Sequence, residues 1–234
     1  MKTIGLLGGM SWESTVTYYR LINEGIKQRL GGLHSAKIVL VSVDFAEVEQ
    51  LQHVGDWQAA GALLTDAAAG LQKAGADFML ICTNTMHKVA AQIQSQVSLP
   101  LLHIADATAD KLLAEGVSTV GLLGTRFTME QDFYKQRLIE RGLTVVVPDD
   151  AGRSEVNRVI YDELCLGQIR ESSRQQYQKV IRDLQHAGAE AVILGCTEIG
   201  LLVRAQDSPL PLYDTTEIHA KIAVQYALEC DENG

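Results

Sequence analysis

The sequence predicts an α/β protein built from two similar lobes, each a mostly parallel sheet flanked by helices. Short apolar runs alternate with longer amphipathic stretches, which is the pattern of repeated β-α-β units. The apolar runs are continuous rather than alternating, as expected where helices cover both faces of a sheet. The second half of the chain also repeats segments of the first half in the same order, which indicates a duplicated lobe.

Each expected element follows from the spacing of apolar residues. Residues 57–74 give the clearest example, because the apolar residues of this segment recur at helix spacing. They are Ala60, Leu63, Leu64, Ala67, Ala68 and Leu71. Short runs of consecutive apolar residues are typical of buried strands. In chain order we expect a strand over 4–7, a helix over 14–26, a strand over 37–43, the helix over 57–74, a strand over 78–81, a helix over 87–94, a strand over 101–104 and, further on, a helix over 158–170.

Three segments of the first half recur in the second half at similar offsets. A single match between Gly- and Ala-rich segments arises easily by coincidence, but three in register indicate a two-fold repeat. The spacing is too long for a solenoid, so the repeat predicts two lobes with a cleft between them. The matches are Ile4–Gly8 with Val120–Gly124, Leu71–Asp77 with Leu184–Glu190, and Leu99–Leu101 with Leu210–Leu212.

Composition excludes several classes of protein. The 234 residues carry a net charge of −9 with no cluster of Lys or Arg, so nucleic-acid binding is not expected. Hydrophobic residues make up 47% and charged residues 21%, which argues against a disordered or collagen-like chain. No apolar run reaches the ~18 residues that span a bilayer. Residues 1–10 are expected to form a buried strand rather than a signal peptide.

Cysteine and histidine usage indicates a reducing compartment and no metal centre. The four cysteines are too few for a disulfide scaffold in a chain of this size, and they form no CxxC pair. Reduced thiols, and therefore a cytoplasmic protein, are the simplest interpretation. The six histidines show no metal-ligand spacing, so no metal site is expected.

The residues just after each strand are the candidates for chemistry, because open α/β sheets bind ligands beyond the carboxyl ends of their strands. Continuing the second match through the strand that follows it pairs Thr83 with Cys196. A thiol at a strand end and a helix start is expected to have a lowered pKa, because nearby backbone N–H groups favour the thiolate. The same register pairs Cys82 with Gly195, Asn84 with Thr197 and Thr85 with Glu198.

The cysteines differ in their expected roles. Burial as a small hydrophobic residue is the alternative for Cys196, but its place at a strand end favours function. Cys165, in the helix expected over 158–170, and Cys230, in the polar tail, are expected to have no catalytic role.

Polar loops follow two further strands. Residues 8–14 and 124–128 are rich in Gly and hydroxyl side chains, and such loops can hold anions through backbone N–H groups. Neither loop contains GxGxxG or GK[ST], so a structural tight turn is an equally ordinary interpretation. Arg126 is available for a distal carboxylate or for the surface, and Gln52 and His87 are positioned either to reach the site or to occupy ordinary helix positions.

These segments resemble the aspartate/glutamate racemase family over nearly the whole chain. The resemblance implies two pseudo-symmetric α/β lobes with an active site in the cleft between them, and frequent homodimers. It also implies that the chain end returns to the first lobe, which gives lobes over 1–98 with 210–234 and over 99–209. The resemblance is carried by Ile4–Met10, Cys82–His87, Gly121–Thr125 and, most specifically, Leu194–Ile199.

The resemblance implies racemisation of a small polar amino acid, such as aspartate or glutamate, without pyridoxal phosphate or another cofactor. Such enzymes use two thiols on opposite faces of the substrate, one removing the α-proton and the other delivering a proton. The side chains that would bind the substrate are Met10, Gln52, Asn84, Thr85, Thr125, Thr128, Thr197 and Glu198.

The sequence departs from the family pattern at the first thiol. Thr83 stands in that position, and the cysteine falls one residue earlier, at Cys82. A hydroxyl is a much weaker resting base than a thiol, whose ordinary pKa is ~8.5. We therefore expect Cys196 to act as the base, Thr83 to act as a weak or water-assisted proton partner, and exchange to favour one direction.

Two other functions are compatible with these residues. One is a related isomerase or decarboxylase of small dicarboxylates that uses Cys196 alone. The other is a protein that binds an amino acid without turnover. The retained thiol and the Gly195–Glu198 block favour an enzyme.

Overall fold

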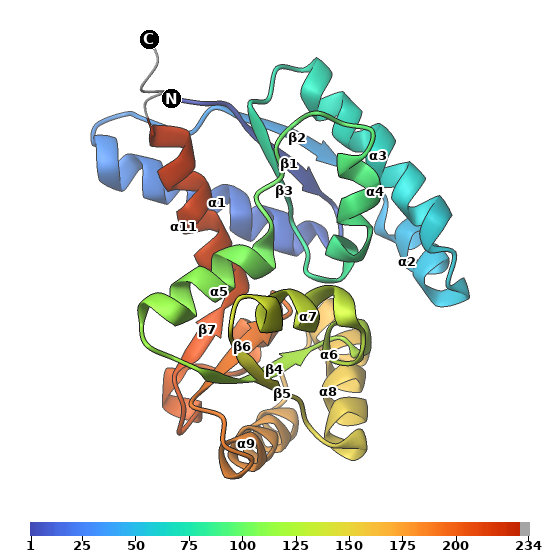
Figure 1. The fold of residues 1–234 in the computed structure, drawn as a ribbon, viewed down its shortest axis with the longest axis vertical. Helices are drawn as coiled ribbons and strands as arrows, with labels where there is room; N and C mark the ends of the chain where they lie inside the picture. The colour runs from blue at the N-terminus through green and yellow to red at the C-terminus, as the bar shows by residue number, and fades with distance from the viewer. Residues whose placement is uncertain (230–234) are drawn as a thin grey trace. The chain divides into compact units, whose positions relative to one another are not determined.

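The computed structural model describes residues 1–229 of the 234-residue chain. The chain divides into two compact units, each with its own parallel sheet (Figure 1). Unit 1 consists of Met1–Ile104 and the described residues from His219 onward, and unit 2 consists of Ala105–Ile218. The chain therefore leaves unit 1 after Ile104 and returns after Ile218, whereas the sequence-based boundaries lie after residues 98 and 209.

The sheet of unit 1 is parallel, which confirms the expected fold class. Its central strand β1 (Ile4–Gly8) lies between β2 (Ile38–Ser42) and β3 (Phe78–Ile81). Every residue of β1 and β3 is buried, because helices cover both faces of the sheet. The ends of these two strands are therefore fixed by packing as well as by the ladder of hydrogen bonds.

The strand expected over 101–104 does not form. Leu101 adds one isolated bridge to β3, and helix α5 (Ile104–Ala114) then begins. The ladder stops because the Leu102 carbonyl accepts a hydrogen bond from the ring of His219, 2.8 Å away, instead of from another strand. That partner lies far along the chain, so the apolar run alone could not predict the break.

Two core clusters of unit 1 lie on opposite faces of its sheet. On one face α3 packs against β1 and β2, and Leu7 and Ile81 belong to this cluster. On the other face Leu6 and Leu80 form a cluster with α1 and α11. The helices of unit 1 are α1 (Trp12–Leu30), α2 (Phe45–Val54), α3 (Trp57–Lys73), a 3₁₀ helix over Thr85–Val89, α4 (Ala90–Gln94) and α11 (Thr215–Leu228), whose first residues belong to unit 2.

The 3₁₀ helix replaces the first part of the α-helix expected over 87–94. Its first turn is tight because the His87 N–H donates to the Asn84 carbonyl, three residues back, at 3.1 Å. Only the second part of the segment, Ala90–Gln94, is α-helical.

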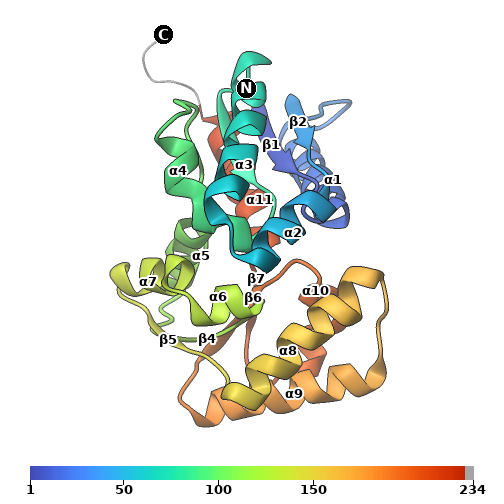
Figure 2. The ribbon, with the colours of Figure 1, turned by 90° about the vertical axis from the view of Figure 1, so that its right-hand side faces the viewer.

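The sheet of unit 2 is also parallel and has one more strand, in the order β5-β4-β6-β7. Helices α8 and α9 pack against each other in this unit (Figure 2). The strands are β4 (Thr119–Gly124), β5 (Thr144–Val146), β6 (Ala191–Gly195) and β7 (Leu212–Asp214). Besides α5, the helices are α6 (Arg126–Glu130), α7 (Asp132–Glu140), α8 (Asp150–Asp162), α9 (Glu171–His186), α10 (Ile199–Leu202) and 3₁₀ helices over Leu164–Leu166 and Ala205–Asp207.

The single helix expected over 158–170 is broken. The chain leaves helical geometry after Asp162, and Gly167 adopts a positive φ of 71°. The break falls at Glu163, whose side chain is 2% exposed and accepts hydrogen bonds from Arg158 at 2.8 Å and Ser173 at 2.5 Å. Cys165 lies in the 3₁₀ turn that follows, and Cys230 lies outside the described residues.

The two sheets share one register, as the sequence repeat predicts. Ile4 pairs with Phe78 in unit 1, and the matching Val120 pairs with Ala191 in unit 2. The third match also agrees, because the Pro100 carbonyl accepts from the Met79 N–H at 2.8 Å and the Pro211 carbonyl accepts from the Val192 N–H at 2.9 Å. The register within each unit therefore shows which residue after β3 corresponds to which residue after β6.

The last helix of each repeat belongs to the other unit. From Ala105 onward, α5 belongs to unit 2, although it follows the strands of unit 1. From His219 onward, α11 belongs to unit 1, where Ala220, Ala223 and Val224 lie in the core against α1. The N-terminus is tied to the same helix, because the Lys2 N–H donates to the Ala227 carbonyl at 2.9 Å.

His219 is held in unit 1 as a neutral ring. The Leu102 carbonyl can only accept, so Nε2 carries the proton and Nδ1 accepts from the Tyr18 hydroxyl at 2.8 Å. Complete burial lowers the pKa of His219 from 6.5 to about 4, because water no longer stabilises the charged ring.

This burial predicts a loss of stability in mild acid. Because the unfolded chain binds a proton at His219 near pH 6.5 and the folded chain only near pH 4, stability should be intact above about pH 6.5 and fall toward pH 4. The loss should reach about 3 kcal/mol. Urea unfolding measured across this range should show a shallower pH dependence for His219→Gln than for the wild type. Equal slopes would contradict the buried neutral ring.

Candidate active site

Thr83 is the first partly exposed residue after β3 in unit 1. The preceding residue is still held by the sheet, because the Cys82 N–H donates to the Leu7 carbonyl at 2.9 Å. On the other side, the Thr83 carbonyl lies 2.8 Å from Nδ1 of His87. Asn84 and Thr85 follow and are buried. Hydrogen bonds therefore hold the backbone just before Thr83 and at its own carbonyl.

Cys196 occupies the corresponding place after β6 in unit 2. Its Sγ donates to Oε2 of Glu198 at 2.9 Å, and the Thr197 hydroxyl donates to the same oxygen at 2.6 Å. The structure therefore brings three of the expected site residues together around one carboxylate oxygen. It also gives the thiol an acceptor that could take its proton.

The expectation that the pKa of Cys196 is lowered is wrong. Burial, followed by the negative charge of Glu198, raises the pKa of the Cys196 thiol well above its ordinary value. The expected helix does not counteract this, because α10 begins only at Ile199 and spans four residues. A carboxylate in hydrogen-bonding contact outweighs the end of so short a helix.

The shared register makes Thr83 and Cys196 equivalent residues of the two sheets. In unit 1 β3 ends opposite Leu7, and in unit 2 the matching Leu123 pairs with Leu194. Counting onward pairs Cys82 with Gly195 and Thr83 with Cys196, which is the pairing given by the sequence repeat.

Cys82 is unsuited to proton transfer at the strand end. It is fully buried in the core cluster that contains Leu80, on the side of α1 and α11, and burial raises its pKa far above the ordinary value. Its counterpart Gly195 is constrained too, because a Cβ there would lie 2.8 Å from the Leu123 carbonyl oxygen.

The polar loop of unit 2 holds a capping site. Thr125 is the N-cap of α6 and accepts from the Thr128 N–H at 3.3 Å, and the two hydroxyl oxygens are 3.2 Å apart. Arg126 lies at the surface and pairs with Glu130 at 2.8 Å, so its guanidinium already has a carboxylate partner. Both threonines are buried beside the end of β4.

Met10 and Gln52 lie in the core of unit 1. Met10 is 3% exposed, and Gln52, at 5%, donates from Nε2 to the sulfur of Met86 at 2.9 Å. Gln52 is therefore a buried residue next to the 3₁₀ helix that follows Thr83, not a solvated one. The structure brings it to the segment after β3 through Met86.

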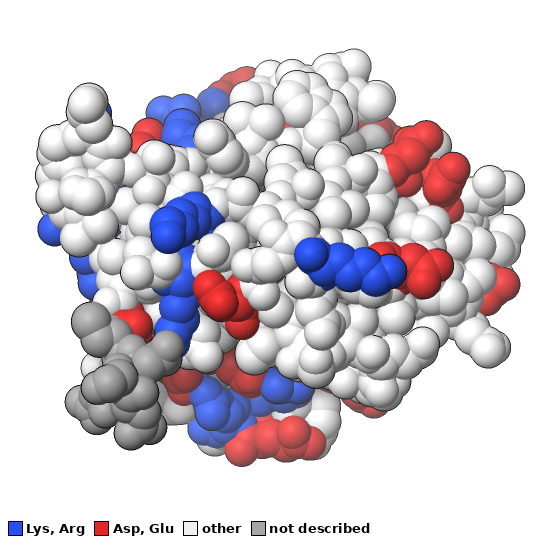
Figure 3. Space-filling model, turned by 90° about the horizontal axis from the view of Figure 1, so that it is seen from above, with Lys and Arg blue, Asp and Glu red and all other residues white. Residues whose placement is uncertain are grey.

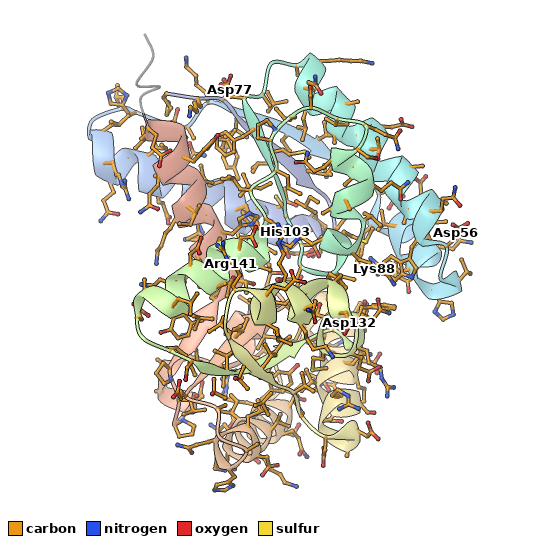
Figure 4. The ribbon with its side chains drawn as sticks, in the orientation of Figure 1. Asp56, Asp77, Lys88, His103, Asp132 and Arg141 are labelled. Carbon is orange, nitrogen blue, oxygen red and sulfur yellow. The ribbon has the colours of Figure 1, made fainter. Side chains whose placement is uncertain are left out.

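Sequence reasoning missed a buried cluster of three histidines near Thr83. His87 is 3% exposed, and its ring lies 4.5 Å from that of His103 and 6.0 Å from that of His219 between centroids. His103 is labelled in Figure 4, at the same end of unit 1 as Lys88. The sequence offered a signal only for His87, one turn after Asn84. The contact between His87 and His219 depends on the return of α11 to unit 1.

Other types of site find no support in the part of the chain that the structure describes. No group of three or more His, Cys, Asp or Glu side chains among residues 1–229 could hold a metal ion. On the face shown in Figure 3, Lys and Arg side chains are interspersed with acidic ones rather than gathered in one patch. None of the described helices is both long and apolar enough to cross a bilayer.

Comparison with known proteins identifies the family. The model of the Asp/Glu/hydantoin racemase family matches residues 7–223, which covers both units. The chain belongs to this racemase family. Two similar structures agree with the assignment, because they extend over nearly the whole chain rather than over one unit.

Three relatives show the extent of the similarity. A Yersinia pestis protein provisionally assigned as an Asp/Glu racemase is 58% identical, with 98% of this chain and 100% of that chain covered and a TM-score of 0.93. An aspartate racemase homologue from Pyrococcus horikoshii is 35% identical over the same shares, with a TM-score of 0.85. The broad specificity amino-acid racemase RacX of Bacillus subtilis is 26% identical over 167 residues, 69% of each chain.

The contact between Cys196 and Glu198 predicts the direction of a measurable shift. Glu198→Gln removes the negative charge that opposes the thiolate, so alkylation of Cys196 by iodoacetamide should reach its half-maximal rate at a lower pH. The measurement requires the other three cysteines to be replaced by alanine. Glu171→Gln, which removes an exposed carboxylate of the same unit, is the control and should leave the profile in place.

Proposed function

We propose that the protein is a cofactor-independent racemase of a small acidic amino acid such as aspartate or glutamate. Cys196 removes the α-proton from one face of the substrate, and Thr83 delivers a proton to the opposite face. The observation that carries the proposal is the equivalence of these two residues in sheets of one register, within a chain of the racemase family. A pair of equivalent groups suits a reaction whose substrate and product are mirror images.

Cys196 must lose its own proton before it can act as a base. Glu198 Oε2 accepts the hydrogen bond of the thiol, so it is the group to which this proton passes. The resulting thiolate takes the α-proton and becomes a thiol again, while the electron pair of the broken C–H bond moves into the carboxyl group of the substrate. The raised pKa of Cys196 makes its thiolate a stronger base once formed.

Thr83 completes the exchange as a proton donor. Its hydroxyl proton passes to the α-carbon, where the electron pair held in the substrate carboxyl group forms the new C–H bond. Water returns a proton to the threonine oxygen, and the proton that Glu198 took from Cys196 neutralises the hydroxide that remains. The reverse role is unfavourable, because an alkoxide would have to form before the proton could be abstracted. This difference supports faster turnover of the enantiomer whose α-proton faces Cys196.

The developing negative charge on the substrate carboxyl group requires hydrogen-bond donors. We assign this role to the polar residues that follow the strands, because N–H and O–H groups placed before the reaction stabilise such charge at little further cost. The expected residues in unit 1 are Asn84 and Thr85, with Gln52 and Met10 packed behind the same segment. Those in unit 2 are Thr125, Thr128 and Thr197.

The proposal includes a cytoplasmic location and a homodimeric state. The reduced thiols of Cys82, Cys165 and Cys196 support a reducing, cytoplasmic compartment. A homodimer is supported by α1, which exposes Trp12, Val16 and Tyr19 along one face at helical spacing.

Deuterium exchange tests the assignment of Cys196. In deuterated water without added cofactor, the wild type should deuterate the α-carbon of one enantiomer of aspartate or glutamate faster than that of the other, as read by chiral chromatography with mass spectrometry. Cys196→Ala should lose this exchange by about a thousandfold or more. Retained exchange would overturn the role of Cys196, and equal rates for both enantiomers would remove the asymmetry.

A second substitution tests the role of Thr83. Thr83→Cys places a thiol at the position equivalent to Cys196, so racemisation of the disfavoured enantiomer should rise by about tenfold or more. The initial rates from the two enantiomers should become more nearly equal. Thr83→Ser, which keeps a hydroxyl, is the matched control. The absence of any gain in the cysteine variant would contradict the equivalence of the two positions.

A further inference from the structure

The ring of His87 contacts the backbone of Thr83, the proposed proton donor, and not the Thr83 side chain. Its Nδ1 lies 2.8 Å from the Thr83 carbonyl oxygen, and its Nε2 lies 3.3 Å from the N–H of Ile104. The ring is 3% exposed. It therefore connects the segment after β3 to the last residue of the first stretch of unit 1.

These two contacts select one form of the ring. The Ile104 N–H can only donate, so Nε2 must be the acceptor and cannot carry a proton. The Thr83 carbonyl can only accept, so Nδ1 must carry the proton. A neutral imidazole protonated at Nδ1 satisfies both bonds, whereas the charged ring would lose the bond from Ile104. His87 is thus held neutral by its partners.

The bond to the carbonyl restrains the backbone from which the Thr83 side chain projects. The sheet holds the residue before Thr83 through the bond from Cys82 N–H to Leu7 carbonyl. His87 holds the peptide that follows. With the N–H of Cys82 held by the sheet and the Thr83 carbonyl held by His87, the direction of the Thr83 Cα–Cβ bond is restrained, because only the φ and ψ angles between these two hydrogen bonds could change it.

The repeat is broken at this position. The residue four places after Cys196 is Gly200, which has no side chain to reach back, and a Cβ there would lie 2.7 Å from Oδ2 of Asp214. The Cys196 carbonyl accepts from the Ile199 N–H instead, at 3.1 Å. A side-chain bond to the carbonyl is therefore made at Thr83 and has no counterpart from Gly200 at Cys196. The hydrogen bond from His87 matters more on the threonine side, because the shorter hydroxyl side chain can reach the substrate from fewer backbone positions than the larger thiol can.

We propose that His87 is a positioning residue for the reaction, which holds the Thr83 carbonyl through Nδ1–H and thereby aims the Thr83 hydroxyl at the α-carbon. The inference rests on the proposed function and adds a residue to it. It assigns His87 to the protonation step alone. Removal of the α-proton by Cys196 does not depend on it.

The test uses the fate of the deprotonated substrate in deuterated water. After Cys196 removes the α-proton, return of deuterium from the same side gives the labelled starting enantiomer, whereas delivery by Thr83 gives the labelled opposite enantiomer. The early ratio of inversion to retention is measured on the enantiomer that exchanges faster. This ratio compares two outcomes of one intermediate, so it does not change with the amount of folded enzyme.

Three variants separate positioning from general stability. His87→Phe keeps a ring but removes both nitrogens, and the ratio should fall by about tenfold or more because the donor is displaced. His87→Asn keeps an N–H donor on the Nδ1 side and should retain most of the ratio. His219→Phe removes the same two nitrogens from a neighbouring ring whose bonds go to Leu102 and Tyr18, and should leave the ratio unchanged.

Each other result would overturn part of this account. An unchanged ratio in His87→Phe, or an equal fall in His219→Phe, removes the positioning role and leaves the proposed function intact. A fall in His87→Asn equal to that in His87→Phe shows that the bond to the Thr83 carbonyl is not what matters. If the wild type exchanges no α-proton from any acidic amino acid, the proposed function fails, and the role of His87 with it.

Discussion

The parallel ladder that leads to each of the two candidate residues is the constraint on which the site depends. In unit 1 it joins β1 to β3, and in unit 2 it joins β4 to β6 in the same register. Because the ladder fixes each residue along the strand, it also fixes where the chain leaves the sheet. Buried, fully covered strands prevent a slip of one residue, which would turn every side chain to the other face. Thr83 and Cys196 are therefore equivalent by backbone geometry, not by side-chain resemblance.

Equivalent positions have acquired unlike surroundings. Cys196 faces a carboxylate that keeps its proton in place at rest, and Thr83 is anchored through its carbonyl by a neutral histidine. A thiol with a raised pKa forms little thiolate, but the thiolate that forms is a strong base. A threonine hydroxyl is weakly acidic, so it must be positioned accurately to donate its proton. The duplicated scaffold supplies the symmetry. Glu198, two residues after Cys196, and His87, four residues after Thr83, remove it.

The sequence allowed the register to be predicted because the repeats carry it directly. The Leu99–Leu101 and Leu210–Leu212 match is reproduced by the bonds of Pro100 to Met79 and of Pro211 to Val192. Features that depend on distant partners could not be predicted. The strand expected after Pro100 does not form because of His219, and the helix near Cys165 ends at the buried Glu163. The protonation of Cys196 depends on the rotamer of Glu198, which places Oε2 within hydrogen-bonding distance of the Cys196 sulfur. No sequence pattern specifies such a rotamer.

The exchange of terminal helices has a consequence for biosynthesis. The strands of unit 1 leave the ribosome before those of unit 2, yet Ala220, Ala223 and Val224 of α11 fill one side of its core. Domains usually fold in the order in which they are synthesised. Here unit 1 must wait, with one face of its sheet incompletely covered, until unit 2 and then α11 have been synthesised. The nascent chain therefore carries an exposed apolar surface during that interval, and chaperones that bind such surfaces can act in it.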